Sequence, residues 1–497
     1  MNTRWTVLRQ VAMNSSPTLA TRARTWRRWG TFGFLIARVP HPSHVRCGKG
    51  GIPCLLLVVL ALALPAPART RPHYGGTLRV EVEGDGIQSP DGLLLRLLMD
   101  GLTQAGSDGN PLPALALRWT AENNDHRWQF WLRPGVQFGN GAPLTSTAVV
   151  ASLATACSAN CPWTAVHAVG SSIVFTGDAP MPNLPALLAE NRFLIRLADA
   201  GEGKEPPCCI GTGPFQIAEH AYPAWTLAAN DAYWQGRPFV DKIELTTHKS
   251  IRDQWLDLSV GRADLVEVPA EQLRQAREQR ITVVASPPVS LLALGVADSG
   301  PLVNPALRAA LALALDRGAL SNVIFQKQGE IAASLLPAAV TGYSFLFPAD
   351  RDLNKSHELR GGLSDPSLTL AAEGGNTMQL AAQRLALNLR EAGFNLQVVG
   401  MSSQQHIDLT LRRLTLESTQ AQAALESIER QAGVTAPVVE STPAGLYRVE
   451  REFLDAHTLI PLLYLPRAYA VGGRVRELRL NPNGTPQLAG VSLEDAP

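Results

Sequence analysis

Aromatic and arginine side chains in the second half of the sequence are of types suited to binding a ligand. Tyr343, Phe345 and Phe347 lie in a loop bounded by prolines, where they suit a pocket for apolar ligand groups. The alternative is a surface loop packed against its own domain. Arg412 and Arg413 are adjacent, and a guanidinium binds a carboxylate with two hydrogen bonds, although paired arginines also form solvated faces.

The cysteines favour an oxidising compartment. Cys157 and Cys161 follow a predicted helix at a spacing that suits a disulfide, and Cys208 and Cys209 complete a set of four beyond the leader. Four thiols also suit zinc, but two adjacent cysteines are poorly spaced as ligands of one tetrahedral ion. A disulfide between Cys157 and Cys161 is therefore favoured over zinc, and the pairing of Cys157, Cys161, Cys208 and Cys209 is left open.

Metal, cofactor and catalytic sites are not indicated. His406 and His457 are candidates for a metal or haem, but no supporting ligand set is recognisable around them, so we predict no metal and no cofactor. The glycine-rich segment Gly211–Phe215 is not a phosphate loop, because no Lys-Ser/Thr follows and Pro214 lacks an N–H. Neither a nucleophile elbow nor a His-Glu-x-x-His helix occurs, and we predict that the protein is not an enzyme.

The composition describes a globular chain with an acidic body. Of 497 residues, 45% are hydrophobic, which is enough to bury a large core. Nine of the 44 Lys and Arg precede Arg69, whereas the first of the 43 Asp and Glu is Glu81. From Arg69 onward, 35 basic residues therefore face 43 acidic ones, which argues against binding to nucleic acid.

The first 68 residues read as a leader that is removed. Cys54–Leu64 is an apolar run too short to span a bilayer but suited to a signal peptide, and Ala66 and Ala68 suit cleavage. Residues 1–44 are either a basic leader or membrane-surface segment, or an upstream extension with the true start near Val45. No cysteine follows the apolar run closely, so we expect export to the periplasm or another extracytoplasmic space without a lipid anchor.

The mature chain alternates between strand and helix patterns. Strands are predicted at 77–82, 128–132 and 459–465. Helices are predicted at 93–102, after a cap at Thr145 or Ser146, and at 306–315. Residues 368–370, 378–389 and 394–398 predict a strand, a helix ended by Gly393, and a second strand parallel to the first. These patterns indicate a mixed α/β protein.

Six segments in order carry a family resemblance. They are Tyr74–Leu78, the Trp-x-Phe and Gly-x-Pro-Leu-Thr pattern of 128–145, Gly211–Phe215, Asn230–Asp241, Asn304–Arg317 and Pro461–Tyr464. Together they resemble the family 5 extracellular solute-binding proteins, the dipeptide, oligopeptide and nickel receptors of ABC importers. Most of these residues suit turns and core packing, so the resemblance concerns the fold more than the ligand.

The resemblance implies a two-lobed periplasmic-binding-protein-like α/β fold with two crossings at the hinge. The first lobe is then residues 69–288 and 458–497, and a shortened second lobe is 289–457. The implied function is binding of a peptide-like or other small solute, in the cleft between the two lobes, by a monomer that presents it to ABC permease subunits in the membrane. The alternative is a degenerate family member that acts as a partner-binding or sensor protein without transport.

The resemblance also suggests ligand-binding positions. Related proteins bring the loop after the first strand to the cleft, which makes Glu83 and Asp85 candidates, although a solvated turn is the alternative. Peptide-binding relatives place an aspartate after a strand that resembles His406–Leu411, but their motif is missing here. Asp408 is the nearest carboxylate and Arg412 follows it, so both complete the candidate set with Tyr343 and Phe345.

Overall fold

The computed structural model describes residues 73–84, 92–106, 110–157, 161–197, 210–342, 347–361, 367–418, 420–433 and 442–494. Residues 71–497 form one compact unit. The predicted leader, residues 1–68, lies outside the described residues, as do Asp85, Tyr343, Phe345, Cys208 and Cys209. In the described ranges, no helix is long and apolar enough to cross a membrane.

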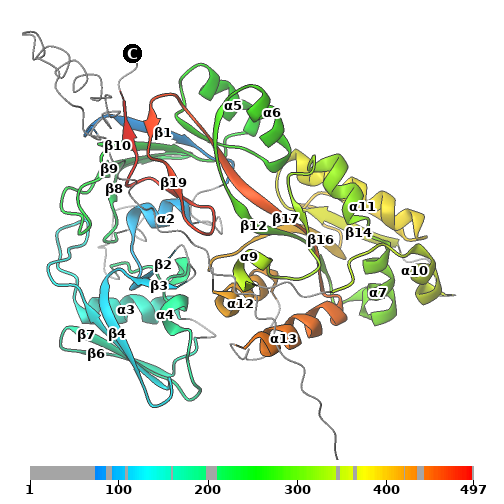
Figure 1. Cartoon of the computed structure of the whole chain (residues 1–497), viewed down its shortest axis with the longest axis horizontal. Helices are drawn as coiled ribbons and strands as arrows, with labels where there is room; N and C mark the ends of the chain where they lie inside the picture. Colours follow the sequence, from blue (N-terminus) through cyan, green and yellow to red (C-terminus); the bar gives the residue numbers. More distant parts are fainter. Residues whose placement is uncertain are drawn as a thin grey trace, which may run out of the picture. The chain divides into compact units, whose positions relative to one another are not determined.

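One large mixed sheet organises the molecule (Figure 1). Its order is β15, β14, β16, β12, β17, β11, β1, β10, β9, β8, and β13 pairs with β17. The strands are β1 Thr77–Glu81, β8 Phe215–Ala221, β9 Ala224–Ala229, β10 Lys242–Thr246, β11 Leu265–Glu267, β12 Thr282–Val296, β13 Glu330–Ile331, β14 Ser367–Ala372, β15 Asn395–Val399, β16 Leu409–Thr415 and β17 Leu459–Val471. β1 runs parallel to β10 and β11, and β14 runs parallel to β15 and β16.

Two long antiparallel strands join the two ends of this sheet. β12 and β17 pair from Thr282 opposite Val471 to Gly295 opposite Leu459, and Figure 1 shows them side by side between the flanking strands. The register shifts on both sides of Pro288. Pro287 and Pro288 have no N–H to donate, and the N–H of Arg467 instead donates to the Ser286 hydroxyl at 3.0 Å. The ladder is therefore irregular at this point.

Separate hydrophobic cores lie on the two sides of these long strands. We call the elements packed around Phe215 and Ile243, together with those packed around Phe130, the first lobe. The second lobe packs around Leu385 and Ile428. The predicted lobe boundaries of 69–288 with 458–497, and of 289–457, stay predictions.

The second lobe contains the predicted β-α-β unit. β14 leads into α11, Asn376–Glu391, which returns to the parallel strand β15. The predicted stripe of Met378, Leu385 and Leu389 is buried, and Gly393 has the positive φ of 83° expected after a helix end. This prediction is confirmed. The helix α7, Pro305–Ala314, begins after Asn304, whose side chain accepts from the N–H of Ala306.

A small four-stranded sheet belongs to the first lobe. It consists of β4 Ala116–Glu122, β5 Arg127–Leu132, β7 Ser172–Thr176 and β6 Ala165–Val169, in that order. The rings of Phe130 and Phe175 pack edge to face at 5.4 Å in its core. α3, Ser146–Ala156, covers it and is capped by Thr145, one of the two predicted capping residues. A disulfide joins Cys157 and Cys161 directly after this helix.

The predicted helix at 93–102 is shorter than expected, because glycines approach its end. α2 ends at Leu98, and the Leu98 carbonyl accepts from the N–H of Gly213 at 3.0 Å. A Cβ on Gly211 would lie 2.3 Å from the same carbonyl oxygen. Side chains from the same motifs then surround Asp100, which accepts from Thr212, Tyr233 and Trp234. These motif residues therefore hold the first lobe together.

The remaining elements cover the sheets or form short pairs. The other helices are α4 Leu184–Leu187, α5 Ile251–Ser259, α6 Leu273–Glu278, α8 Arg317–Ala319, α9 Ala338–Thr341, α10 Leu353–Arg360, α12 Ala421–Ala432 and α13 Pro443–Ala456. The short strand pairs are β2 Thr103–Ala105 with β3 Pro111–Pro113, β18 Val475–Arg476 with β21 Ser492–Leu493, and β19 Arg479–Leu480 with β20 Pro486–Gln487.

Candidate functional site

The carboxyl ends of strands from both lobes meet at one cavity. Glu83 follows β1, Glu267 ends β11, Glu373 follows β14, and Thr415 ends β16. All four residues line a cavity of about 810 Å³. In open α/β sheets, ligands bind in the crevice outside the carboxyl ends of the strands. The topology therefore makes this cavity the candidate binding site.

The lining of the cavity is polar and carries both signs of charge. Its acidic residues are Glu83, Glu267, Glu271 and Glu373, and its basic residues are Arg252, Arg413 and Arg467. Trp255, Met378 and Tyr469 add apolar surface. The volume and the mixed charge suit a small polar ligand with ionised groups, rather than an apolar one.

Arg413 presents a guanidinium to this cavity. Successive residues of a strand point to opposite faces, so Arg413 lies on the other face of β16 from Arg412. The Arg413 side chain is accessible through the cavity and makes no hydrogen bond or ion pair with any residue that the structure describes. Burial lowers the pKa of Arg413, while the nearby carboxylates of Glu271, Glu267 and Glu83 favour its charged form.

Glu83 approaches the same cavity from the first lobe. Its carboxylate oxygen lies 2.7 Å from the position that a Cβ on Gly375 would occupy, at the residue that precedes α11 of the second lobe. The positive end of the helix dipole favours a carboxylate there. Burial nevertheless raises the pKa of Glu83, against the lowering effect of Arg413. A hydrogen bond from Thr377 to Glu271 makes a second contact between the lobes at this cavity.

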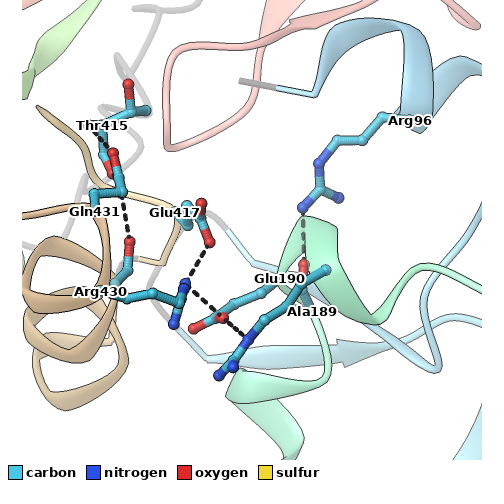
Figure 2. Close-up of polar contacts among 9 residues, drawn as sticks. Arg96, Ala189, Glu190, Thr415, Glu417, Arg430 and Gln431 are labelled. Atoms are coloured by element: carbon cyan, nitrogen blue, oxygen red, sulfur yellow. Dashed lines mark hydrogen bonds and ion pairs between the residues drawn. The ribbon is translucent and has the colours of Figure 1, made fainter. Parts of the chain in front are cut away.

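A second group of charges joins the lobes away from the cavity lining, and Figure 2 shows it. Arg430 on α12 donates to Glu190 at 3.0 Å and to Glu417 at 2.9 Å. Arg192 also donates to Glu190 at 2.9 Å, and the Glu190 side chain is 0% exposed. Burial raises the pKa of Glu190, and the two arginines oppose that shift. We call Glu190, Arg192, Glu417 and Arg430 the buried ion cluster.

Neighbouring residues hold the buried ion cluster in place. Gln431 follows Arg430 on α12, and its side chain both accepts from the N–H of Thr415 and donates to the Thr415 carbonyl. This fixes α12 against the end of β16. On the other side, Arg96 donates to the carbonyl of Ala189 at 2.8 Å, directly before Glu190 (Figure 2).

The predicted site residues have different locations. Glu83 lines the cavity, whereas Asp408 and Arg412 do not. Asp408 accepts from the N–H and the hydroxyl of Thr369, which ties β16 to β14. Arg412 pairs with Glu373 at 3.0 Å and donates to the carbonyl of Gln431. The ligand-binding roles of Asp408 and Arg412 stay predictions, and Asp85, Tyr343 and Phe345 lie outside the described residues.

The histidines considered as metal or haem ligands have partners of other kinds. His406 hydrogen-bonds to the hydroxyl of Ser299 at 2.9 Å, and His457 to the carbonyl of Asp455 at 2.9 Å. Neither lines the cavity. Within the described ranges, no group of three or more His, Cys, Asp or Glu is arranged to hold a metal ion.

Sequence reasoning considered Arg413 beside Arg412 but left it out of the candidate set, and it missed Glu267 and Glu271 altogether. The signal for Arg413 was its place on β16, since Leu409, Leu411 and Arg413 share one face of the strand and the two leucines belong to the core around Leu385. Arg413 and Thr415 are the members of this face nearest the carboxyl end, and both line the cavity. Glu267 and Glu271 had no comparable signal, because β11 is only three residues long.

Known proteins resemble this chain in sequence. The profile of the bacterial extracellular solute-binding proteins, family 5 (Middle), matches residues 110–433. The protein YhjP of Bacillus subtilis is 30% identical over 234 residues, 45% of this chain and 37% of YhjP. A probable di/tripeptide-binding protein of Pseudomonas aeruginosa is 25% identical over 400 residues, 69% of this chain and 75% of that protein. The chain thus spans little more than a third of YhjP.

Solved structures share the fold. The dipeptide-binding protein of Pseudoalteromonas, solved with Met-Leu, superposes with a TM-score of 0.75 at 14% identity, over 84% of this chain and 100% of that one. The predicted two-lobed α/β fold of periplasmic binding proteins is confirmed by this similarity. Because the family profile covers more than half of the sequence, this chain belongs to family 5 of the bacterial extracellular solute-binding proteins.

Proposed function

We propose that the protein binds a small peptide-like solute in the cavity between its lobes and presents it to the permease of an ABC importer. The observation that carries this proposal is the cavity itself, at the carboxyl ends of strands from both lobes. Its charged lining from both lobes supports an ionised ligand over an apolar one. The peptide-binding names of relatives such as the Pseudomonas protein support the peptide class.

A ligand in this cavity favours the closed arrangement of the lobes. Glu83 belongs to the first lobe and Arg413 to the second, so a ligand that contacts both gains its full interaction energy only when the lobes are close. A ligand shifts a conformational equilibrium by no more than its difference in affinity for the two states. The closed, loaded form is then the one that a permease distinguishes from the empty form.

The proposal includes the setting of the protein. Residues 1–68 act as a removed export leader, and the mature protein is an extracytoplasmic monomer without catalytic activity. The first lobe comprises residues 69–288 and 458–497 and the second residues 289–457. β12 and β17, which run from one lobe into the other, support crossings near those boundaries.

The test is ligand binding by the full chain, expressed with its own leader and purified without refolding. Native mass spectrometry detects a ligand that co-purifies, and thermal unfolding is then followed with a panel of free-acid di- and tripeptides. A peptide that binds only the folded state raises the free energy of unfolding by about 2.7 kcal/mol at a concentration of a hundred times its Kd, and Tm rises with it. We expect at least one peptide to do so.

The opposite result is equally informative. If no mass above that of the chain is found and no peptide raises Tm, binding of a peptide-like solute is contradicted. A folded protein that gives this result would favour the alternative of a partner-binding or sensor protein without transport.

A further inference from the structure

We propose that Arg413 is the anion anchor of the cavity: it binds a ligand carboxylate, while the ligand's ammonium group faces Glu83 and the neighbouring carboxylates of Glu267 and Glu271. This rests on the proposed function and adds the ligand's chemistry, a zwitterion with separated charges. Arg413 is accordingly a specificity-determining residue of this chain.

The first step is that Arg413 is an unsatisfied guanidinium. It has five N–H donors, and none bonds to a described residue. By contrast, the adjacent Arg412 is held by Glu373 and by the carbonyl of Gln431. A guanidinium that faces a cavity with free donors matches the planar, two-oxygen geometry of a carboxylate.

The second step is the charge opposite Arg413. Glu83 also lacks a side-chain hydrogen bond or ion pair with any residue in the described ranges, although it lies near enough to Arg413 to affect its pKa. The two opposite charges therefore face one cavity without pairing. A group placed between them that carries a single sign would satisfy one and leave the other unpaired, which favours a ligand with both signs.

The third step is the balance of the whole lining. Four carboxylates and three guanidiniums line the cavity, and Arg412 from outside the lining pairs with Glu373. The charges are then equal in number, so the site as a whole has no net preference for a cation or an anion. Selectivity must come from where each sign lies, and Arg413, whose donors bond to no described residue, lies near the carboxylates of Glu83, Glu267 and Glu271.

The experiment measures the affinity of the tightest peptide from the free-acid panel, together with its C-terminal amide and its N-acetyl form, by isothermal titration calorimetry. The variants are R413Q, R413K and R118Q, all in the full chain. We expect R413Q to weaken binding of the free acid by about tenfold to a hundredfold, the range for a lost charge-assisted hydrogen bond. R413K should keep part of the affinity that R413Q loses, because lysine carries the positive charge but lacks the two parallel N–H donors of a guanidinium.

R118Q is the matched control, since it removes the same group from an exposed position on β4 that does not line the cavity. It should leave the affinity nearly unchanged. The C-terminal amide should bind the wild type weakly and lose little more in R413Q, whereas the N-acetyl form should still respond to R413Q. A Tm of R413Q close to that of the wild type shows that the variant is folded.

Three outcomes overturn the inference. If R413Q binds the free acid as tightly as the wild type does, the anchor is elsewhere and the proposed function stands. If R413Q weakens the amide as much as the acid, Arg413 shapes the cavity without binding the carboxylate. If the wild type binds no peptide of the panel, the inference and the proposed peptide function fall together.

Discussion

Two sets of charges connect the lobes, and they differ in what satisfies them. At the cavity, Glu83 and Arg413 come from different lobes, are accessible, and do not pair. In the buried ion cluster, Arg430 spans the lobes to reach Glu190, whose side chain is fully buried. Glutamate and arginine thus have different roles in the two places, because a buried carboxylate needs a partner within the chain and a carboxylate that faces the cavity does not.

This difference separates a contact that holds the lobes from one that awaits a ligand. Paired buried charges are strongly destabilised when one partner is removed, because the other is left uncompensated. Accessible, unpaired charges keep their solvation when a neighbour is changed. Substitutions in the buried ion cluster should therefore change stability, and those at the cavity should change binding.

The largest effect is expected from R430M. Loss of Arg430 leaves the fully buried Glu190 with Arg192 alone and removes the partner of Glu417. We expect the free energy of unfolding at pH 8, measured by urea denaturation, to fall by about 1–3 kcal/mol. R413Q is the comparison and should change it by about 0.5 kcal/mol or less. Equal effects of the two variants would contradict the distinction between the buried ion cluster and the cavity.

An intermediate effect is expected from pH. Burial raises the pKa of Glu190 above its ordinary 4.5 in the folded state, so the folded protein binds a proton more tightly there than the unfolded chain does. Stability from this group is present below pH 4.5 and is lost as the pH rises through the higher folded pKa. Each tenfold difference in proton affinity between the folded and unfolded states corresponds to about 1.4 kcal/mol of stability.

The variant E190Q isolates this contribution. We expect the unfolding free energy of the wild type to fall relative to that of E190Q between pH 4.5 and 8, as measured by urea denaturation across the range. Parallel curves for the two proteins would show that burial does not perturb Glu190 in this way.

The smallest effect is expected from G375A. The φ of Gly375 is −75°, which alanine adopts easily, but its Cβ would lie 2.7 Å from the Glu83 carboxylate. Glu83 must move, so peptide affinity should fall severalfold by calorimetry, while stability changes by less than about 1 kcal/mol. G473A is a suitable control, because a Cβ there meets no atom within 4 Å. An unchanged affinity would show that Glu83 does not contribute to peptide binding.

Local patterns predicted much of the fold. Asn304 before Pro305 located α7, and the apolar stripe around Leu385 located α11, because caps and helical periodicity act over a few residues. The end of α2 was not predictable in this way. It depends on Gly211 and Gly213, more than a hundred residues later, whose backbones approach the carbonyl of Leu98.

The candidate site was less predictable, since its charges meet only in the folded chain. Glu83 was foreseen from its place after the first strand. Arg412 was chosen over Arg413, although only the latter lines the cavity, because the choice depends on which face of β16 points to the carboxyl-end crevice. Arg430 and Glu190 are 240 positions apart, and nothing local to either marks the other as its partner.

The proline pair in the crossing strands has a consequence for motion. Where β12 carries Pro287 and Pro288, the backbone hydrogen bonds to β17 are interrupted, and a serine hydroxyl serves the nearest amide of β17. Bending the β12–β17 pair at this point therefore distorts few backbone hydrogen bonds. We expect the lobes to open and close about this point, with the sheet on either side moving as a rigid body.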